Sequence, residues 1–175
     1  MTMLAPARRD FVDASRPADD RSEATPATYL EALQLLERLH RLMQDLVKDE
    51  FERLGRQDLN PVQALILYNL GESEVSAGEL RSRGMYQGSN VSYNLKKLVS
   101  MGYVHHERCD LDRRSVRVRL TEAGQEVRQI VLTLFCRHAE QLAMSGVLDD
   151  PPLAQVNLQA RRIERYWIEQ IRYIY

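Results

Sequence analysis

Short polar and basic side chains gather on one predicted helix, which Gly102 should end. Its apolar positions recur at helical spacing and mark the face that packs on a core: Val91, Leu95, Leu98 and Val99. The opposite face is assigned to amides, hydroxyls and lysines: Asn90, Ser92, Tyr93, Asn94, Lys96 and Lys97. Amides and hydroxyls can hydrogen-bond base edges and phosphates, and lysines attract the DNA backbone whatever its sequence. The pattern indicates a helix that reads DNA.

A predicted β-hairpin follows this helix. Val116, Val118 and Leu120 alternate with Arg117 and Arg119, which is the period of a half-buried strand. The preceding strand runs through Tyr103–Glu107, and the tip between the strands carries Arg113 and Arg114. An arginine on a narrow projecting loop can enter the minor groove, where the negative potential is strongest.

Positive charge is concentrated on this helix and hairpin. Residues 88–119 hold seven basic side chains against three acidic ones, whereas the whole chain has a formal net charge of −1. A charge run is often only a solvated face. Here it coincides with the segment whose pattern indicates DNA recognition, which favours the nucleic-acid interpretation.

The sequence also predicts the helices that position these residues. Residues 1–27 lack a sustained period and suggest a disordered arm. A leucine-rich helix is predicted over residues 28–55, beginning with a Thr28–Glu31 capping box and ending at Gly55. Residues 56–120 should form the DNA-binding lobe. The second helix of the chain, which is the first in this lobe, is capped by Asn60 and ends at Gly71. A short third helix begins near Ser76 and ends at Gly84.

Two further helices are predicted over residues 121–175, the first capped by Thr121 and the second by Asp150-Pro151. Their apolar stripes and that of the first helix exceed what a lobe of about sixty residues can bury. A two-fold homodimer is the simplest partner, and it would place two reading helices about one DNA turn apart, ~34 Å, as a palindromic site requires. The expected fold is therefore mainly α, a winged helix-turn-helix with a short β-hairpin wing and dimerisation helices at both ends.

The sequence resembles the MarR family of bacterial transcription regulators over residues 28–175. The resemblance rests on SAGELRSRGMYQGSNVSYNLKKLVSMGYV and on the wing DLDRRSVRVRLTEAG, which matches Asp-x-Arg followed by Leu-Thr-x-x-Gly at Asp112, Arg114, Leu120, Thr121 and Gly124. The resemblance implies that Arg114 enters the minor groove, that Asp112 organises it, and that Ser89, Asn90, Ser92, Tyr93 and Asn94 lie at reading positions. Tyr93 stands where many members have arginine, so base preference does not carry over.

The resemblance also implies a homodimer that represses or activates genes, with double-stranded DNA as its partner. It implies that a small phenolic or other aromatic effector binds between the dimer helices and the DNA-reading lobe. His40, Met43, Phe51 and Tyr68 are the candidate pocket residues, although a packed or half-exposed histidine is the alternative for His40.

Two alternative functions stay open at this point. Cys109 follows Arg108 on the wing, and a nearby guanidinium lowers a thiol pKa, so a redox-responsive regulator is one alternative. A dimeric winged-helix interaction module without DNA binding is the other, and it would be expected to lack the basic wing and polar helix seen here. Cys136 is interpreted as a small core residue.

Several classes of protein are excluded by what the sequence lacks. It contains no GxSxG, HExxH or CxxC motif and no Gly-rich phosphate loop after a strand, so neither an enzyme nor a cofactor is expected. His105 and His106 are adjacent on a strand and point to opposite faces, which argues against a shared metal. Neither a secretory signal nor a bilayer-length apolar run is apparent, so a cytoplasmic protein with no membrane partner and free thiols is expected.

Overall fold

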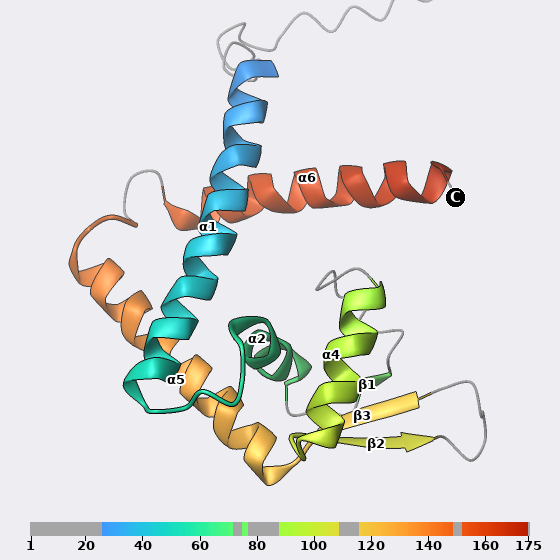
Figure 1. Ribbon diagram of the computed structural model, residues 1–175. Helices are drawn as coiled ribbons and strands as arrows, with labels where there is room; N and C mark the ends of the chain where they lie inside the picture. Colours follow the sequence, from blue (N-terminus) through green and yellow to red (C-terminus); the bar gives the residue numbers. More distant parts are fainter. Residues whose placement is uncertain (1–25, 72–74, 77–87, 109–115, 149–151, 175) are drawn as a thin grey trace, which may run out of the picture. The chain divides into compact units, whose positions relative to one another are not determined.

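The computed structural model describes residues 26–71, 75–76, 88–108, 116–148 and 152–174. These residues are mostly helical, with one small sheet (Figure 1). The elements are α1 (Pro26–Arg53), α2 (Pro61–Leu70), β1 (Val75–Ser76), α4 (Gly88–Ser100), β2 (Val104–Arg108), β3 (Val116–Leu120), α5 (Glu122–Met144) and α6 (Leu153–Ile174). The predicted fold class, a mainly α protein with a hairpin wing, is confirmed.

The chain divides into two compact units, Met1–Met43 and Gln44–Tyr175. Helix α1 runs through the boundary, so its first 18 residues belong to the first unit and its last ten to the second. The helix begins at Pro26 rather than at Thr28, because proline fits the first turn of a helix, where its missing N–H has no partner to lose. The helix ends as predicted near Gly55, whose φ is +69°.

Helix α2 forms the centre of the second unit. The Asn60 side chain accepts a hydrogen bond from the Gln63 backbone N–H (2.9 Å), and the Gln63 side chain accepts one from the Asn60 N–H (3.1 Å). This is the capping box that the sequence predicts. Helix α2 packs against α5 and β3. The least exposed apolar side chains of this unit come from α2 itself and from the elements around it: Val47, Ala64, Leu65, Ile66, Leu67, Leu70, Leu98, Val118, Val127, Val131 and Leu134.

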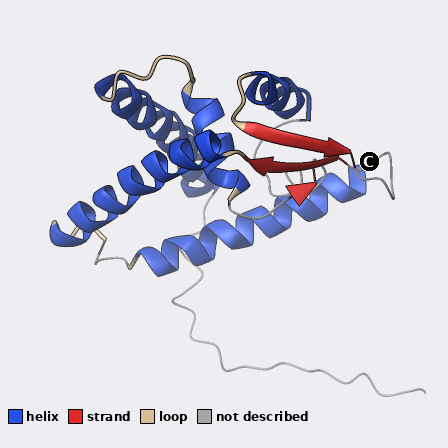
Figure 2. Cartoon of the chain, turned by 90° about the horizontal axis from the view of Figure 1, so that it is seen from below, coloured by secondary structure: helices blue, strands red, loops and turns tan. Residues whose placement is uncertain are grey.

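The sheet has three antiparallel strands in the order β1-β3-β2 (Figure 2). The β2–β3 hairpin is confirmed, with Val104 opposite Leu120 and His106 opposite Val118. Strand β1 is an addition to the prediction: Val75 pairs with Val118 and Ser76 with Arg117, which gives β3 hydrogen-bonding neighbours on both edges. The sequence predicts that Ser76 begins a helix, and this is wrong because Ser76 belongs to β1. The predicted third helix after it, residues 77–83, lies outside the described residues.

Two capping predictions hold for the later helices. At the end of α4, the Gly102 N–H donates to the Val99 carbonyl (3.0 Å) and the Tyr103 N–H to the Leu98 carbonyl (2.9 Å), a Schellman motif with Gly102 at φ +79°. Thr121 caps α5 by accepting from the Gly124 N–H (3.1 Å). The Asp150-Pro151 cap expected before α6 lies outside the described residues.

Cys136 corrects one prediction about α5. The helix buries Val127, Val131 and Leu134, which share one face at spacings of four and three residues. Cys136 lies five residues after Val131, which places it well away from that face, and it is exposed rather than a core residue.

Candidate nucleic-acid interface

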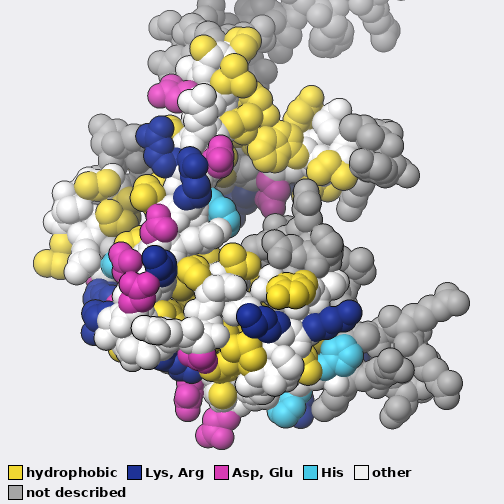
Figure 3. Space-filling model, viewed as in Figure 1, with side chains coloured by type: hydrophobic (Ala, Val, Ile, Leu, Met, Phe, Trp, Pro, Cys, Tyr) yellow, Lys and Arg dark blue, Asp and Glu magenta, His cyan; other side chains and the backbone are white. Residues whose placement is uncertain are grey.

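Helix α4 presents a polar and basic surface to solvent. Tyr93 is 65% exposed, and Ser92, Lys96 and Lys97 are exposed with it. On the face seen in Figure 3, basic side chains lie over α4. The other side of the helix is anchored by Leu95 and Leu98, and α4 packs against β2. Ser89 and Asn90 lie in the first turn of α4, and their side chains are outside the described part of the structure.

Asn94 does not belong to this surface. The prediction that it shares the exposed polar face is wrong, because the residue is only 5% exposed. The reason lies in its spacing: Asn94 follows Val91 by three residues and precedes Leu98 by four, so it occupies the apolar stripe itself. The chemical type of Asn94 predicts an exposed residue, but its helical position places it in the core. Asn94 is therefore a buried polar residue of the reading helix.

The hairpin carries further basic side chains on its exposed face. Arg117 and Arg119 are exposed on β3, and they alternate with the buried Val118 and Leu120 as the sequence predicts. Arg119 lies opposite His105, which is also exposed. The tip of the hairpin, with Cys109, Asp112, Arg113 and Arg114, lies outside the described residues.

Tyr103 connects the reading helix to the wing. Its side chain is 7% exposed, and its hydroxyl donates a hydrogen bond to an oxygen of the Asp58 carboxylate. The hydroxyl accepts a second hydrogen bond from Nη2 of Arg56 (3.0 Å), whose guanidinium lies 6.0 Å from the centre of the ring. Burial, and then the hydrogen bond to Asp58, raise the pKa of Tyr103 above its usual value, so the phenol stays protonated. No motif or spacing in the sequence marks Arg56, Asp58 and Tyr103 as a group.

The Leu-Thr-x-x-Gly motif has a structural explanation at the same junction. The Thr121 hydroxyl donates to the Gly102 carbonyl (2.7 Å), and the Thr121 N–H donates to the Tyr103 carbonyl (3.0 Å). Gly124 lies so close that a Cβ there would stand 2.2 Å from the Tyr103 carbonyl oxygen. Threonine and glycine therefore hold the start of α5 against the backbone that joins α4 to β2.

A buried carboxylate joins α1 to α5. Glu50 is 9% exposed and accepts two hydrogen bonds from Arg53 (2.8 and 2.9 Å) and one from Arg137 (3.1 Å). The Arg53 hydrogen bonds are the largest influence on the Glu50 pKa. They lower it against the opposing effect of burial, and with Arg137 they bring the pKa from 4.5 to about 2. Glu50 thus stays ionised at every physiological pH.

Replacement of Glu50 by glutamine is expected to lower the free energy of unfolding by about 1–2 kcal/mol at pH 7, because both arginines lose a charged partner but remain partly solvated. A carboxylate whose folded pKa is depressed stabilises the protein above its unfolded pKa and loses that effect as pH falls. The difference between wild type and Glu50→Gln should therefore shrink between pH 4.5 and about 2. Urea denaturation at several pH values measures it.

Glu52→Gln is the matched control, since Glu52 forms an exposed ion pair with Lys48 (3.6 Å) and should contribute little. Equal stability of Glu50→Gln and wild type at pH 7 would contradict a structural role for the Glu50 ion pairs.

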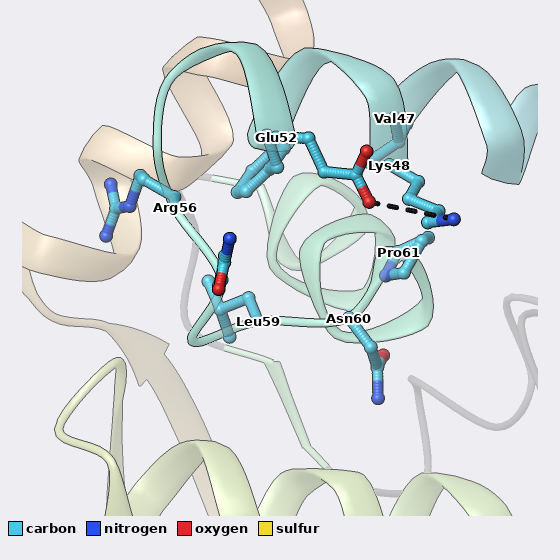
Figure 4. A pocket seen from close by; sticks show the side chains of 9 residues that line it. Val47, Lys48, Glu52, Arg56, Leu59, Asn60 and Pro61 are labelled. Atoms are coloured by element: carbon cyan, nitrogen blue, oxygen red, sulfur yellow. Dashed lines mark ion pairs between the residues drawn. The ribbon is translucent and has the colours of Figure 1, made fainter.

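The four predicted effector-pocket residues fall into different surroundings. His40 is exposed and Met43 half-buried in the first unit, whereas Phe51 and Tyr68 belong to the second. The Tyr68 ring packs edge-on against Phe135, with the ring centres 5.3 Å apart. Phe51 lines a hollow of about 470 Å³ at the end of α1 and the start of α2 (Figure 4).

This hollow, called here the linker hollow, has apolar and charged sides. The lining side chains include Val47, Phe51, Leu59 and Pro61, together with Lys48, Glu52 and Arg56. Lys48 faces Glu52 at one side, and Arg56 points the opposite way (Figure 4). Within the described part of the chain, no three His, Cys, Asp or Glu side chains are grouped as a metal site, and no helix is long and apolar enough to cross a bilayer.

Comparison with known proteins agrees with this geometry. The family profile for winged helix DNA-binding domains matches residues 59–124. The chain is 35% identical over 158 residues to the exopolysaccharide II synthesis transcriptional activator ExpG of Rhizobium meliloti, covering 90% of this chain and 81% of that protein.

Two solved structures are similar to the chain. One is a MarR transcriptional regulator from Methanosarcina mazei, with 26% identity and a TM-score of 0.54 over 64% of this chain and 79% of that one. The other is the transcriptional regulator SlyA, with 19% identity and a TM-score of 0.68 over 82% and 99%. The fold and the exposed basic helix define a winged-helix DNA-binding protein that regulates transcription. The chain belongs to the MarR family of transcriptional regulators.

Proposed function

We propose that this regulator acts as a homodimer on a palindromic operator. The exposed face of α4, with Tyr93, Lys96 and Lys97, together with the exposed Arg117 and Arg119 of β3, is the observation that carries the proposal. Two such faces related by a two-fold axis match two half-sites about one DNA turn apart, ~34 Å. Activation of transcription is the proposed sign of regulation, supported by the relative ExpG, which is an activator.

The apolar surfaces of α1 and α6 support the dimer. Hydrophobic side chains gather along α1 in Figure 3. The exposed ones on this helix are Tyr29, Leu30, Leu35, Leu36, Leu39, Leu42 and Leu46, and those on α6 are Leu153, Val156, Leu158, Tyr166, Trp167, Ile168 and Ile171. Surfaces of this kind are rarely left in water by a soluble chain, and a second copy that carries the same stripes is a self-complementary partner.

Within the interface we assign different tasks to the exposed side chains. Lys96 and Lys97 contact phosphates and so add affinity for any sequence, whereas Tyr93, with Ser89, Asn90 and Ser92, contacts base edges. Arg114 at the wing tip enters the minor groove, held by Asp112 and accompanied by Arg113. Asn94 is left out of the direct contacts because it is buried in the helix.

Substitution of Lys96 and Lys97 by alanine is expected to weaken binding to all DNA and to lower the slope of log affinity against log salt by about 1 for each lost phosphate contact. Tyr93→Ala should instead change which bases are preferred and leave the salt slope close to that of wild type. Binding-site selection from random DNA, followed by salt titrations, measures both. Identical preferred sites for wild type and Tyr93→Ala would contradict the assignment, and so would an unchanged salt slope for the lysine variants.

A small aromatic or phenolic effector is the proposed signal, and the linker hollow is its proposed site. Phe51, Leu59 and Pro61 offer apolar contact to a ring, and Lys48 lies at the side of the hollow where it can pair with a carboxylate or phenolate. An aromatic acid should change operator affinity in the same binding assay, and it should do so less in a Lys48→Met variant.

A further inference from the structure

The backbone of Tyr103 belongs to both DNA-contacting elements. Its N–H closes the last turn of α4 through the Leu98 carbonyl (2.9 Å), and strand β2 begins at the next residue, Val104. Its carbonyl accepts from the Thr121 N–H (3.0 Å), directly before α5. A displacement of Tyr103 therefore moves the end of the reading helix and the base of the wing together.

The side chain of Tyr103 reaches a different part of the chain. Its hydroxyl bonds to Asp58 and Arg56, which lie 45 and 47 residues earlier, in the segment between α1 and α2. Arg56 and Asp58 also approach each other, with 3.8 Å between Nε and a carboxylate oxygen. We call these three residues the linker clamp (Arg56, Asp58 and Tyr103).

The linker side of the clamp is itself fixed. The Arg56 N–H donates to the Phe51 carbonyl (2.9 Å) and so closes the end of α1. Leu59 is 7% exposed, and Asn60 begins α2 with its capping box. Between these two helix ends the segment has little freedom, so the clamp ties the end of α4 to the end of α1 through short, defined connections.

Burial decides what kind of role the clamp can have. Tyr103 is 7% exposed, so it contributes no surface that could contact DNA, and Asp58 carries a negative charge that would be repelled by phosphate. A buried hydroxyl with a carboxylate acceptor and a guanidinium donor is strongly directional, because both bonds involve a charged group. The group can therefore set an orientation without touching the nucleic acid.

We propose that Arg56, Asp58 and Tyr103 are positioning residues for DNA recognition, which hold the reading helix and the wing at a fixed orientation to the end of α1. In the proposed dimer this orientation determines the separation of the two reading helices, so the clamp selects the spacing of the half-sites. The inference rests on the proposed dimeric function for this last step. It adds to that function a group of residues that determines spacing and lies outside the DNA-contacting surface.

The test uses the full-length chain and DNA that the wild type selects from a random library. Tyr103→Phe keeps the buried ring and removes only the hydroxyl, and Asp58→Asn removes the charged acceptor. Each variant is expected to bind the selected site about tenfold more weakly at a temperature where it is fully folded. Each should also discriminate less between that site and versions with one base pair added or removed between the half-sites. The double variant should bind no more weakly than the weaker single one, because both changes break the same hydrogen bond.

Asp49→Asn is the matched control for Asp58→Asn, since Asp49 is an exposed carboxylate near the end of α1 that lies outside the linker clamp and does not line the linker hollow. It should bind and discriminate like the wild type. Unchanged affinity and unchanged spacing preference of Tyr103→Phe would overturn the clamp. So would an affinity loss that follows only the unfolded fraction in a thermal melt. A wild type that selects single, unpaired half-sites would refute the proposed dimeric function instead, and the loss of affinity in Tyr103→Phe would still report on the clamp.

Discussion

Deletion of residues 147–175 is expected to abolish dimerisation and to weaken operator binding by about 10²–10⁴-fold, although the winged helix lies wholly outside the deletion. Among the described side chains of helix α6, residues 153–171, only Ile163 is half-buried and the others are exposed, so removal of the helix takes few contacts from the described core. Its stripe of Val156, Trp167 and Ile171 needs an apolar partner, and burial contributes about 25 cal/mol per Å². Without a dimer, each half-site must be bound alone, and the high effective concentration of the second is lost.

Sedimentation of the truncated protein and a titration on the mapped operator measure the two effects separately. Arg161→Ala, on the same helix but outside the apolar stripe, is the control and should remain dimeric. Circular dichroism should show the truncated chain still folded, because α2, α5 and the sheet keep their mutual contacts. A stable dimer with full operator affinity would show that the interface lies in α1 alone or elsewhere.

Local signals in the sequence predicted most of the elements correctly. Caps and glycines report the backbone geometry of a few neighbouring residues, so the Asn60–Gln63 capping box, the Thr121 cap and the Gly102 terminus all appear where expected. The alternation of Arg117 and Val118 likewise identified the inner and outer faces of β3. These predictions depend on short-range chemistry, which a sequence displays directly.

The predictions that failed concern the angular position of a residue around its helix, or contacts between residues that are far apart in the sequence. Asn94 is predicted to be exposed from its residue type, and Cys136 to be buried from its place after Phe135 in an apolar stretch, but a count of helical positions places Asn94 in the core and Cys136 outside it. Strand β1 has only two residues, which is too short to show the alternating pattern of a strand. It is defined by its pairing with β3, which is distant in the sequence. The linker clamp joins residues 45 to 47 positions apart, and no spacing rule connects an arginine, an aspartate and a tyrosine at that distance.

Gly124→Ala is expected to lower the free energy of unfolding by about 3 kcal/mol or more, the upper range for steric overpacking. The added methyl would lie 2.2 Å from the Tyr103 carbonyl oxygen and 3.2 Å from its carbon. These are backbone atoms, so no side chain can rotate away. Either α5 retreats, which costs the Thr121 N–H its 3.0 Å bond to the same carbonyl, or the junction between α4 and β2 moves.

Gly71→Ala separates this steric effect from backbone strain. Gly71 has a φ of +70° and a ψ of −160° with open space around it, a backbone region almost restricted to glycine, so alanine there should cost about 1–3 kcal/mol of backbone strain without a steric clash. Urea denaturation of both variants, at one protein concentration because dimerisation adds to apparent stability, gives the comparison. Because Tyr103 joins the reading helix to the wing, Gly124→Ala should also weaken operator binding in protein that remains folded, and Gly71→Ala should do so less. A Gly124→Ala variant as stable as wild type would show that α5 can withdraw from the Tyr103 backbone at little cost.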